Sequence, residues 1–375
     1  MSPPLHPRTE LSVESVFSYM SRLAAQHGAI NLGQGVPASP PPAFLQEAAR
    51  RAIGTFDQYT PPQGLPQLRE AIAGDLGLLA DQIVVTAGAT EALHTLAESL
   101  YGAGDEVLII EPYFDVYIPH ARMAAAKPVL VPMRLTDRWE ADLTALSRAI
   151  TAATRALIIT NPYNPTGSIF SRPELEEISA LARRHDLWII SDEVYDELYF
   201  DQPPIKIREL APERVFTVGS SGKRLEATGW RIGWIVAPPG LAPAVTGLRQ
   251  WASFCSAAPL QAAVAECLPI ARKEGFYQKL REDYRSNRNL LDQGLKSLGI
   301  RTFPSSGTYF MTARLPGLTA QELVEEAKVA AIPGSAFYWG TPAPEGLFRF
   351  SFCKSAAEIE QAFERLRRYL QLKGW

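Results

Sequence analysis

The stretch QIVVTAGATEALHTLAESLY (residues 82–101) decides the class of fold. It begins with a short run of β-branched residues, which is typical of a buried strand, and passes through Thr-Ala-Gly into a segment with helical spacing of its apolar residues. A strand that leads directly into a helix is the repeating unit of α/β folds. The question is therefore whether this unit recurs along the chain.

It does recur on both sides of this stretch. Further strand-like runs occupy residues 105–110, 127–132, 155–160, 187–193, 215–221 and 231–237. Helical patterns of roughly 10 to 15 residues separate several of them, and such alternation predicts a mostly parallel sheet covered by helices on both faces. The predicted fold class is therefore α/β.

The character of the sequence changes towards the C-terminus. Residues 275–299 have the pattern of one long amphipathic helix with charged residues on its outer positions, which we expect to join two domains. The strand-like and helical segments that follow predict a smaller α/β unit with its own core. We therefore expect an N-terminal segment over 1–42 that packs with the small domain, a large domain over 43–275 and a small C-terminal domain over 276–375.

The composition is typical of a soluble globular protein. The chain is 46% hydrophobic and 21% charged, and its formal net charge of −3 provides no excess of positive charge to bind nucleic acid. Cys255, Cys267 and Cys353 lack metal-type spacing, which argues against a zinc site or a disulfide framework. We find neither a signal-peptide pattern nor an uncharged stretch of about 20 residues. We therefore expect a cytoplasmic protein that binds no metal, nucleic acid or membrane.

Ligands of open α/β sheets bind beyond the carboxyl ends of the strands, so the loops that follow the strands are the places to search. Residues 87–90, Ala-Gly-Ala-Thr, lead into a helix N-terminus, where free N–H groups and the helix dipole can bind an anion such as phosphate. The alternative is a plain helix start. The loop NPYNPTG (161–167) contains two Asn-Pro steps and is either a simple turn or a source of ligand-binding amides.

The segment LWIISDEVYDELYF (187–200) places Asp192 and Tyr195 just beyond a buried strand. A carboxylate at such a position is costly unless it meets a cation or a hydrogen-bond donor. Asp192 is therefore either a helix cap or the partner of a protonated ring nitrogen in a ligand. In the second case Tyr195 could reach the same ligand with its phenolic oxygen.

The segment SSGKRLEATGWRIGW (220–234) places Lys223 between two strand-like runs that predict burial. A buried lysine usually has a charged partner or a covalent role, whereas a lysine that reaches the surface needs neither. Ser220 and Arg231 flank Lys223, so that a hydroxyl and a guanidinium could bind one phosphate while the amine stays near a reactive carbon of the ligand.

Together these loops closely resemble the fold-type I, pyridoxal-phosphate-dependent class I aminotransferases, in the branch of the kynurenine, glutamine and methionine aminotransferases. The resemblance covers nearly the whole chain. The matching motifs, in the order of the family, are INLGQGVPASPPP (30–42), QYTPPQG (58–64), TAGATEAL (86–93), EPYFDVY (111–117), NPYNPTG (161–167), SDEVYDELYF (191–200), SSGKRLEATGWRIGW (220–234) and FRFSF (348–352). The resemblance implies a seven-stranded, mostly parallel sheet in the large domain, pyridoxal 5'-phosphate as the cofactor, and a homodimer.

The resemblance also implies roles for single residues in binding the cofactor. Lys223 would form a Schiff base with the cofactor and later move a proton between the substrate α-carbon and the cofactor. Asp192 would pair with the pyridinium nitrogen, Tyr195 and Asn164 would donate to the phenolate oxygen, and Phe114 would stack on the ring. The phosphate would be bound by Ala89, Thr90, Ser220, Arg231 and Tyr59 of the partner subunit.

For the substrate, the resemblance implies that Arg349 binds the α-carboxylate with its guanidinium fork, beside Asn164 and the backbone of Gly35. From the residues alone, Arg349 could also be an ordinary surface arginine. Phe17 and Phe254 fall at positions where this branch has aromatic pocket residues. We therefore expect a transaminase that moves the amino group of a methionine-, glutamine-, phenylalanine- or kynurenine-type L-amino acid to a 2-oxo acid by a ping-pong mechanism.

Three other functions are compatible with parts of this sequence. A carbon–sulfur β-lyase shares the cofactor, the fold and the lysine, and the sequence separates it poorly from a transaminase. A non-catalytic cofactor-binding regulator would normally carry a DNA-binding helix-turn-helix, for which the roughly 40 residues before the first motif are too few and not basic enough. A nicotinamide dehydrogenase is disfavoured because no G-x-G-x-x-G follows the first strand.

Overall fold

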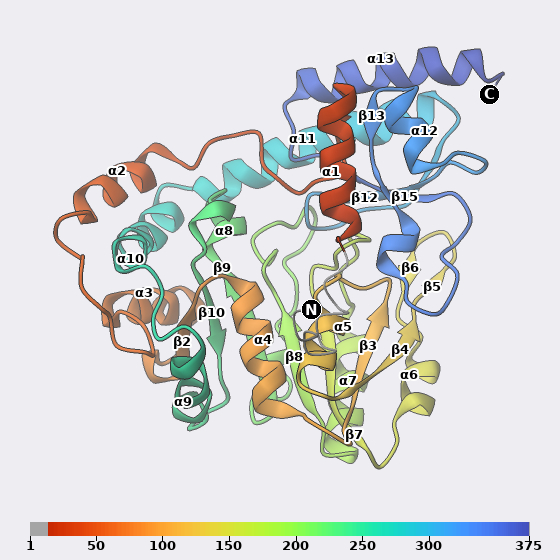
Figure 1. Ribbon diagram of the computed structural model, residues 1–375. Coiled ribbons are helices and arrows are strands. Elements are labelled where there is room, and N and C mark those ends of the chain that lie inside the picture. The colour runs from red at the N-terminus through yellow and green to blue at the C-terminus, as the bar shows by residue number, and fades with distance from the viewer. Residues whose placement is uncertain (1–13, 375) are drawn as a thin grey trace, which may run out of the picture.

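A computed structural model describes residues 14–374 of the chain. Its large sheet has seven strands, with bounds β2 (Ile83–Thr86), β3 (Glu106–Glu111), β4 (Lys127–Pro132), β7 (Thr154–Thr160), β8 (Trp188–Asp192), β9 (Val215–Ser220) and β10 (Gly233–Val236). Their order across the sheet is β2-β10-β9-β8-β7-β3-β4 (Figure 1). Only β10 runs against its neighbours. Each strand coincides with a strand-like run of the sequence, so the predicted mostly parallel sheet is confirmed.

Helices cover both faces of this sheet. Successive residues of a strand point to opposite faces, and along β7 the side chain of Ile158 packs in the core under α4 and α5, whereas that of Ile159 packs under α6 and α7. A third core lies between strands β2 and β10 and the helices α2 (Ala43–Ala52), α3 (Pro66–Leu76) and α10 (Ala258–Lys273). The helices of the large unit are α2 (Ala43–Ala52), α3 (Pro66–Leu76), α4 (Ala89–Leu100), α5 (Tyr117–Met123), α6 (Leu143–Ala149), α7 (Arg172–Arg184), α8 (Ser221–Arg224), α9 (Ala242–Ala252) and α10 (Ala258–Lys273).

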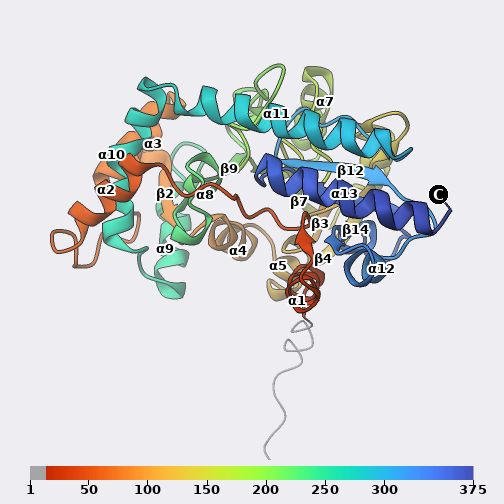
Figure 2. The same cartoon turned by 90° about the horizontal axis from the view of Figure 1, so that it is seen from above.

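The C-terminal part forms a smaller unit around a four-stranded antiparallel sheet in the order β11-β12-β15-β14. The long amphipathic pattern of the sequence becomes α11, which crosses from the large unit to the small one and lies beside α13 (Figure 2). The elements of this part are α11 (Phe276–Ser297), β11 (Arg301–Thr302), β12 (Phe310–Arg314), α12 (Ala320–Glu325), β13 (Val329–Ala330), β14 (Ile332–Pro333), β15 (Leu347–Ser351) and α13 (Ala356–Leu372). Two short strands of the large unit, β5 (Arg134–Leu135) and β6 (Trp139–Glu140), pair with each other.

The segment before the large unit packs on the small one. Helix α1 (Val16–His27) buries Met20 and Leu23 against Val324 and Ile332, and β1 (Ile30–Asn31) pairs in parallel with β13. These contacts support our proposal of an N-terminal segment that belongs with the small domain, with limits near residues 42 and 275.

The strand directions determine where a ligand can bind. The carboxyl ends of β2, β3, β4, β7, β8 and β9 lie at one edge of the sheet, and because β10 is reversed its amino end lies there too. The loops of all seven strands are therefore at this edge, below the small unit. Within residues 14–374, no helix is long and apolar enough to cross a membrane, and no cluster of three His, Cys, Asp or Glu side chains could bind a metal.

Candidate active site

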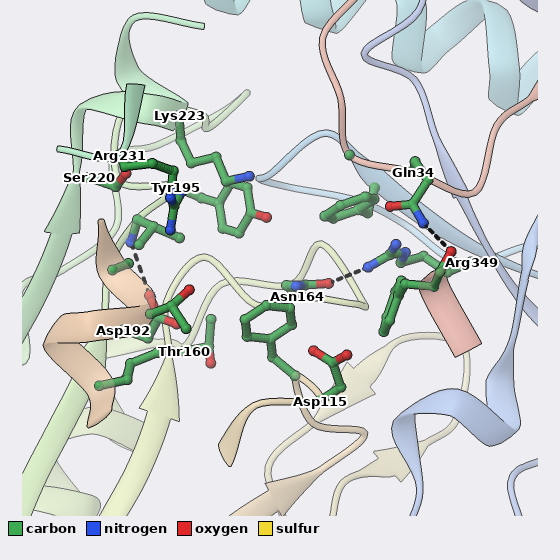
Figure 3. A pocket seen from close by; sticks show the side chains of 18 residues that line it. Gln34, Asp115, Thr160, Asn164, Asp192, Tyr195, Ser220, Lys223, Arg231 and Arg349 are labelled. Atoms are coloured by element: carbon green, nitrogen blue, oxygen red, sulfur yellow. Dashed lines mark hydrogen bonds between the residues drawn. The ribbon is translucent and has the colours of Figure 1, made fainter. Parts of the chain in front are cut away.

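The loops at this edge line one pocket together with the small unit and the N-terminal segment (Figure 3). Among the lining residues are twelve that the sequence predicted for the site: Phe17, Gly35, Ala89, Thr90, Phe114, Asn164, Asp192, Tyr195, Ser220, Lys223, Arg231 and Arg349. These residues come from positions more than 300 apart in the chain, and the fold brings them together.

Lys223 lies on the short helix α8, directly after β9. Ser220 ends the strand, and its Oγ accepts a hydrogen bond of 3.1 Å from the amide of Gly222, which fixes the start of the helix. The Lys223 Nζ donates to the phenolic oxygen of Tyr309 at 2.8 Å and forms no ion pair with a carboxylate of residues 14–374. Burial lowers the pKa of Lys223 to about 8, and the positive charge of Arg231 adds to this effect. A larger fraction of neutral, nucleophilic amine is the result.

Asp192 is the last residue of β8 and is 3% exposed. Its Oδ2 accepts a hydrogen bond of 2.8 Å from the hydroxyl of Tyr117, and its Oδ1 accepts one of 3.3 Å from the amide of Val194. Burial raises the pKa of Asp192 to about 6, although both hydrogen bonds oppose the shift. A buried carboxylate in this state gains free energy from a cation that enters the pocket.

The start of α4 and Arg231 form a positively polarised region. The first N–H groups of α4 have no partner within the helix, and the positive end of its dipole lies there. Gly88 has φ of 81°, a conformation that other residues rarely adopt, and a Cβ added there would lie 2.4 Å from Nη2 of Arg231. A Cβ added to Gly233 would lie 2.6 Å from the backbone of Gly88, so glycine is required at both positions. Arg231 itself has φ of 55°, an uncommon conformation for a residue other than glycine. This arrangement suits an anion such as a phosphate group.

Arg349 lies on β15 and is 2% exposed. Its Nη1 donates to Oδ1 of Asn164 at 2.9 Å and its Nη2 donates to the carbonyl oxygen of Gly33 at 2.7 Å, while its Nε is buried without a partner within residues 14–374. Burial lowers the pKa of Arg349 to about 10, far above neutrality, so the guanidinium stays charged. A buried cation with a spare donor is suited to bind a carboxylate.

Two predicted residues do not line this pocket. Tyr59 is 84% exposed and Phe254 is 44% exposed, and their rings stack edge to face with centroids 5.2 Å apart. For Tyr59 this placement agrees with the expectation that it acts in a second subunit. Phe254 lies outside the pocket of its own chain, because it follows α9 on the outer surface beside Tyr59.

Several lining residues were not predicted: Gln34, Leu93, Asp115, Thr160, Val194 and Phe310. Tyr117 and Tyr309, which bond to Asp192 and Lys223, were missed as well. A signal existed for some of them. Thr160 ends the strand-like run 155–160, and Asp115 and Tyr117 belong to the motif EPYFDVY.

Comparisons with known proteins place this pocket in a family. Residues 27–366 match the family described as aminotransferase class I and II. The chain belongs to this aminotransferase family. The predicted family, fold type, enzyme class and cofactor, pyridoxal 5'-phosphate, are thereby confirmed.

Individual relatives extend the likeness over nearly the whole chain. The chain is 33% identical to mouse kynurenine--oxoglutarate transaminase 1 over 395 residues, which cover 92% of the chain and 93% of the mouse protein. It is similar to the structure of N-succinyldiaminopimelate aminotransferase from Mycobacterium tuberculosis, with a TM-score of 0.93 and 37% identity over 98% of this chain and 100% of that one. It is also similar to YbdL of Escherichia coli, whose structure identified a methionine aminotransferase function, with a TM-score of 0.91 and 32% identity over 97% of this chain and 100% of that one.

The residues of the pocket fit the cofactor of this family. In the described part of the chain, the amine of Lys223 forms no ion pair with a carboxylate and Gly88 leaves room for Arg231 beside the N-terminus of α4. The buried carboxylate of Asp192 gains free energy from a cation. An aldehyde, a phosphate and a protonated ring nitrogen are complementary to these three features.

Proposed function

We propose that the protein transfers the amino group of an apolar, aromatic or amphipathic L-amino acid, of the methionine, glutamine, phenylalanine or kynurenine type, to a 2-oxo acid. The observation that carries this proposal is that aromatic rings surround the guanidinium group of Arg349. Its guanidinium carbon lies 3.8 Å from the ring centroid of Phe310, 5.0 Å from that of Phe337 and 5.1 Å from that of Phe17. An amino acid whose carboxylate binds Arg349 therefore places its side chain near aromatic rings, where apolar groups gain free energy from burial.

When bound, the cofactor supplies an electron sink for the charge that develops at the substrate α-carbon. The residues of the chain do the remaining work. We assign to Lys223 the covalent binding of the cofactor and the movement of the α-proton by its Nζ. Asp192, held in place by Tyr117, keeps the ring nitrogen protonated.

The other predicted residues orient the cofactor and the substrate. We assign Asn164 and Tyr195 to the ring hydroxyl, Phe114 to the ring face, and Arg349 with Gly35 and Asn164 to the substrate carboxylate. The contact of Arg349 with Asn164, at 2.9 Å, couples the two sets of residues. The proposed phosphate ligands in this chain are Ala89, Thr90, Ser220 and Arg231.

We further propose a cytoplasmic homodimer. Tyr59 and Phe254 form an exposed aromatic pair, Trp251 on the preceding helix α9 is 84% exposed, and aromatic residues are enriched in protein interfaces. In the dimer, Tyr59 of the partner subunit binds the phosphate. The free Cys255, Cys267 and Cys353 fit a reducing compartment.

A panel of the twenty common amino acids together with kynurenine tests the proposed substrates. Each is mixed with the holoenzyme, and the loss of the absorbance of the bound aldehyde form is followed. We expect methionine, glutamine, phenylalanine or kynurenine to react fastest and to require a 2-oxo acid for turnover. Fastest reaction with aspartate would contradict the proposed substrate class, and release of pyruvate from an S-aryl cysteine without any 2-oxo acid would indicate a β-lyase instead.

A further inference from the structure

One charged residue of the pocket has no role in the proposed function. Among residues 14–374, the pocket is lined by three cations, Lys223, Arg231 and Arg349, and by two carboxylates, Asp115 and Asp192. The proposed function uses all three cations and Asp192. Among the lining residues of 14–374, no further cation remains to bind an acidic group on the side chain of a substrate, and the remaining charge, Asp115, is negative.

The position of Asp115 puts this charge close to the bound substrate. It follows Phe114 in the loop after β3, and Figure 3 shows its carboxylate pointing towards the contact between Arg349 and Asn164. Burial raises the pKa of Asp115, and the nearby charge of Arg349 is the main opposing influence. The carboxylate interacts with its own backbone amide, but within residues 14–374 no other side chain donates a hydrogen bond to it, so acceptor capacity remains for a ligand.

We propose that Asp115 determines which side chains the enzyme accepts: it excludes amino acids with a side-chain carboxylate and favours those with a side-chain N–H donor. The proposal rests on the proposed function, because it assumes that Arg349 binds the α-carboxylate. Like charges forced together in a site of low dielectric repel strongly, whereas an N–H donor gains a charge-assisted hydrogen bond. Glutamine and glutamate separate these effects, because they have nearly the same shape and differ in charge.

The test compares the wild-type holoenzyme with Asp115→Asn, which keeps the shape of the side chain and removes its charge. The ratio of kcat/KM for glutamine to that for glutamate is measured, with methionine as an uncharged reference. We expect the substitution to lower this ratio by on the order of tenfold or more and to change kcat/KM for methionine by less than that for glutamate. Asp137→Asn is the matched control, because Asp137 is a fully exposed carboxylate that pairs only with Arg301 at the surface.

A second measurement does not depend on turnover. The binding of two unreactive acids, glutarate and its monoamide, to the holoenzyme is measured by calorimetry. In Asp115→Asn, and likewise in Asp115→Ser, glutarate should bind roughly tenfold more tightly and the monoamide more weakly. If the preference between the two acids is unchanged while methionine still reacts, the inference about Asp115 is wrong and the transaminase proposal stands. If no amino acid reacts at all, the transaminase proposal fails, and the binding preference still decides the role of Asp115.

Discussion

The Nζ of Lys223 lies 2.8 Å from the phenolic oxygen of Tyr309, and the same hydroxyl donates to the carbonyl oxygen of Gly35 at 2.9 Å. One tyrosine of the small unit thus links the amine of the large unit to the N-terminal segment. Because this partner is neutral, the amine is oriented without the ion pair that would keep it protonated. Burial lowers its pKa to about 8, although the nearby carboxylate of Asp192 acts in the opposite direction.

We predict that Lys223→Ala abolishes turnover while the protein still binds pyridoxal 5'-phosphate. Loss of both the covalent attachment and the proton carrier should reduce kcat by at least about 10³-fold, since general acid–base catalysis alone contributes on that order. Absorbance after dialysis measures the bound cofactor, and steady-state rates measure the loss. Lys279→Ala, at an exposed lysine that lies 3.9 Å from Asp283, serves as control. Turnover within tenfold of the wild type would show that another group moves the proton.

We predict that Asp192→Asn stabilises the cofactor-free protein at neutral pH. Because the folded-state pKa of Asp192, about 6, lies above the unfolded value of 3.8, this group favours folding below pH 3.8 and loses that contribution as the pH rises through 6. Asparagine carries no charge, so the variant does not lose this contribution to the free energy of unfolding, which is at most about 3 kcal/mol. Urea unfolding at pH 7 should therefore favour the variant, and the difference should vanish near pH 4.

The same substitution should have the opposite effect once the cofactor binds. Asparagine cannot keep the ring nitrogen protonated, so we expect weaker cofactor binding and a lower kcat at every pH. The exposed Asp137→Asn should change neither the stability nor the cofactor affinity. A cofactor-free Asp192→Asn protein that is less stable than the wild type at pH 7 would mean that its hydrogen bonds with Tyr117 and Val194 outweigh the cost of the charge.

We predict that Arg349→Lys raises the dissociation constant of the amino acid by far more than that of the cofactor. Lysine keeps the positive charge but loses the fork that contacts Asn164 and Gly33, and truncation of a buried charge pair costs about 2–5 kcal/mol. Titration with an unreactive carboxylic acid isolates this effect from chemistry. Arg301→Lys, at a surface arginine, is the control. Equal affinity in the Arg349 variant and the wild type would remove Arg349 from the substrate site.

The sequence predicted the strands of the large sheet because buried parallel strands are continuous apolar runs, and each run became a strand in the expected place. It could not predict that β10 is reversed, since periodicity carries no direction. The site residues at the ends of strands, such as Asp192 and Ser220, were predicted for the same reason, because the end of an apolar run marks where the strand passes into its loop. Tyr309 and Phe310 were missed, because only the packing of β12 against the large unit brings them to Lys223 and Arg349.

A last prediction concerns the exposed rings of Tyr59, Trp251 and Phe254. Such exposed rings are costly in water, so we expect light scattering to give a homodimer and Trp251→Glu to shift it towards monomer. If Tyr59 of the partner subunit donates to the phosphate, then Tyr59→Phe should weaken cofactor binding by about 0.5–3 kcal/mol without changing the oligomeric state. Trp339→Glu, at a ring that is 47% exposed and packs against Arg122, should leave the dimer intact. A wild-type monomer with full activity would contradict both the interface and the shared site.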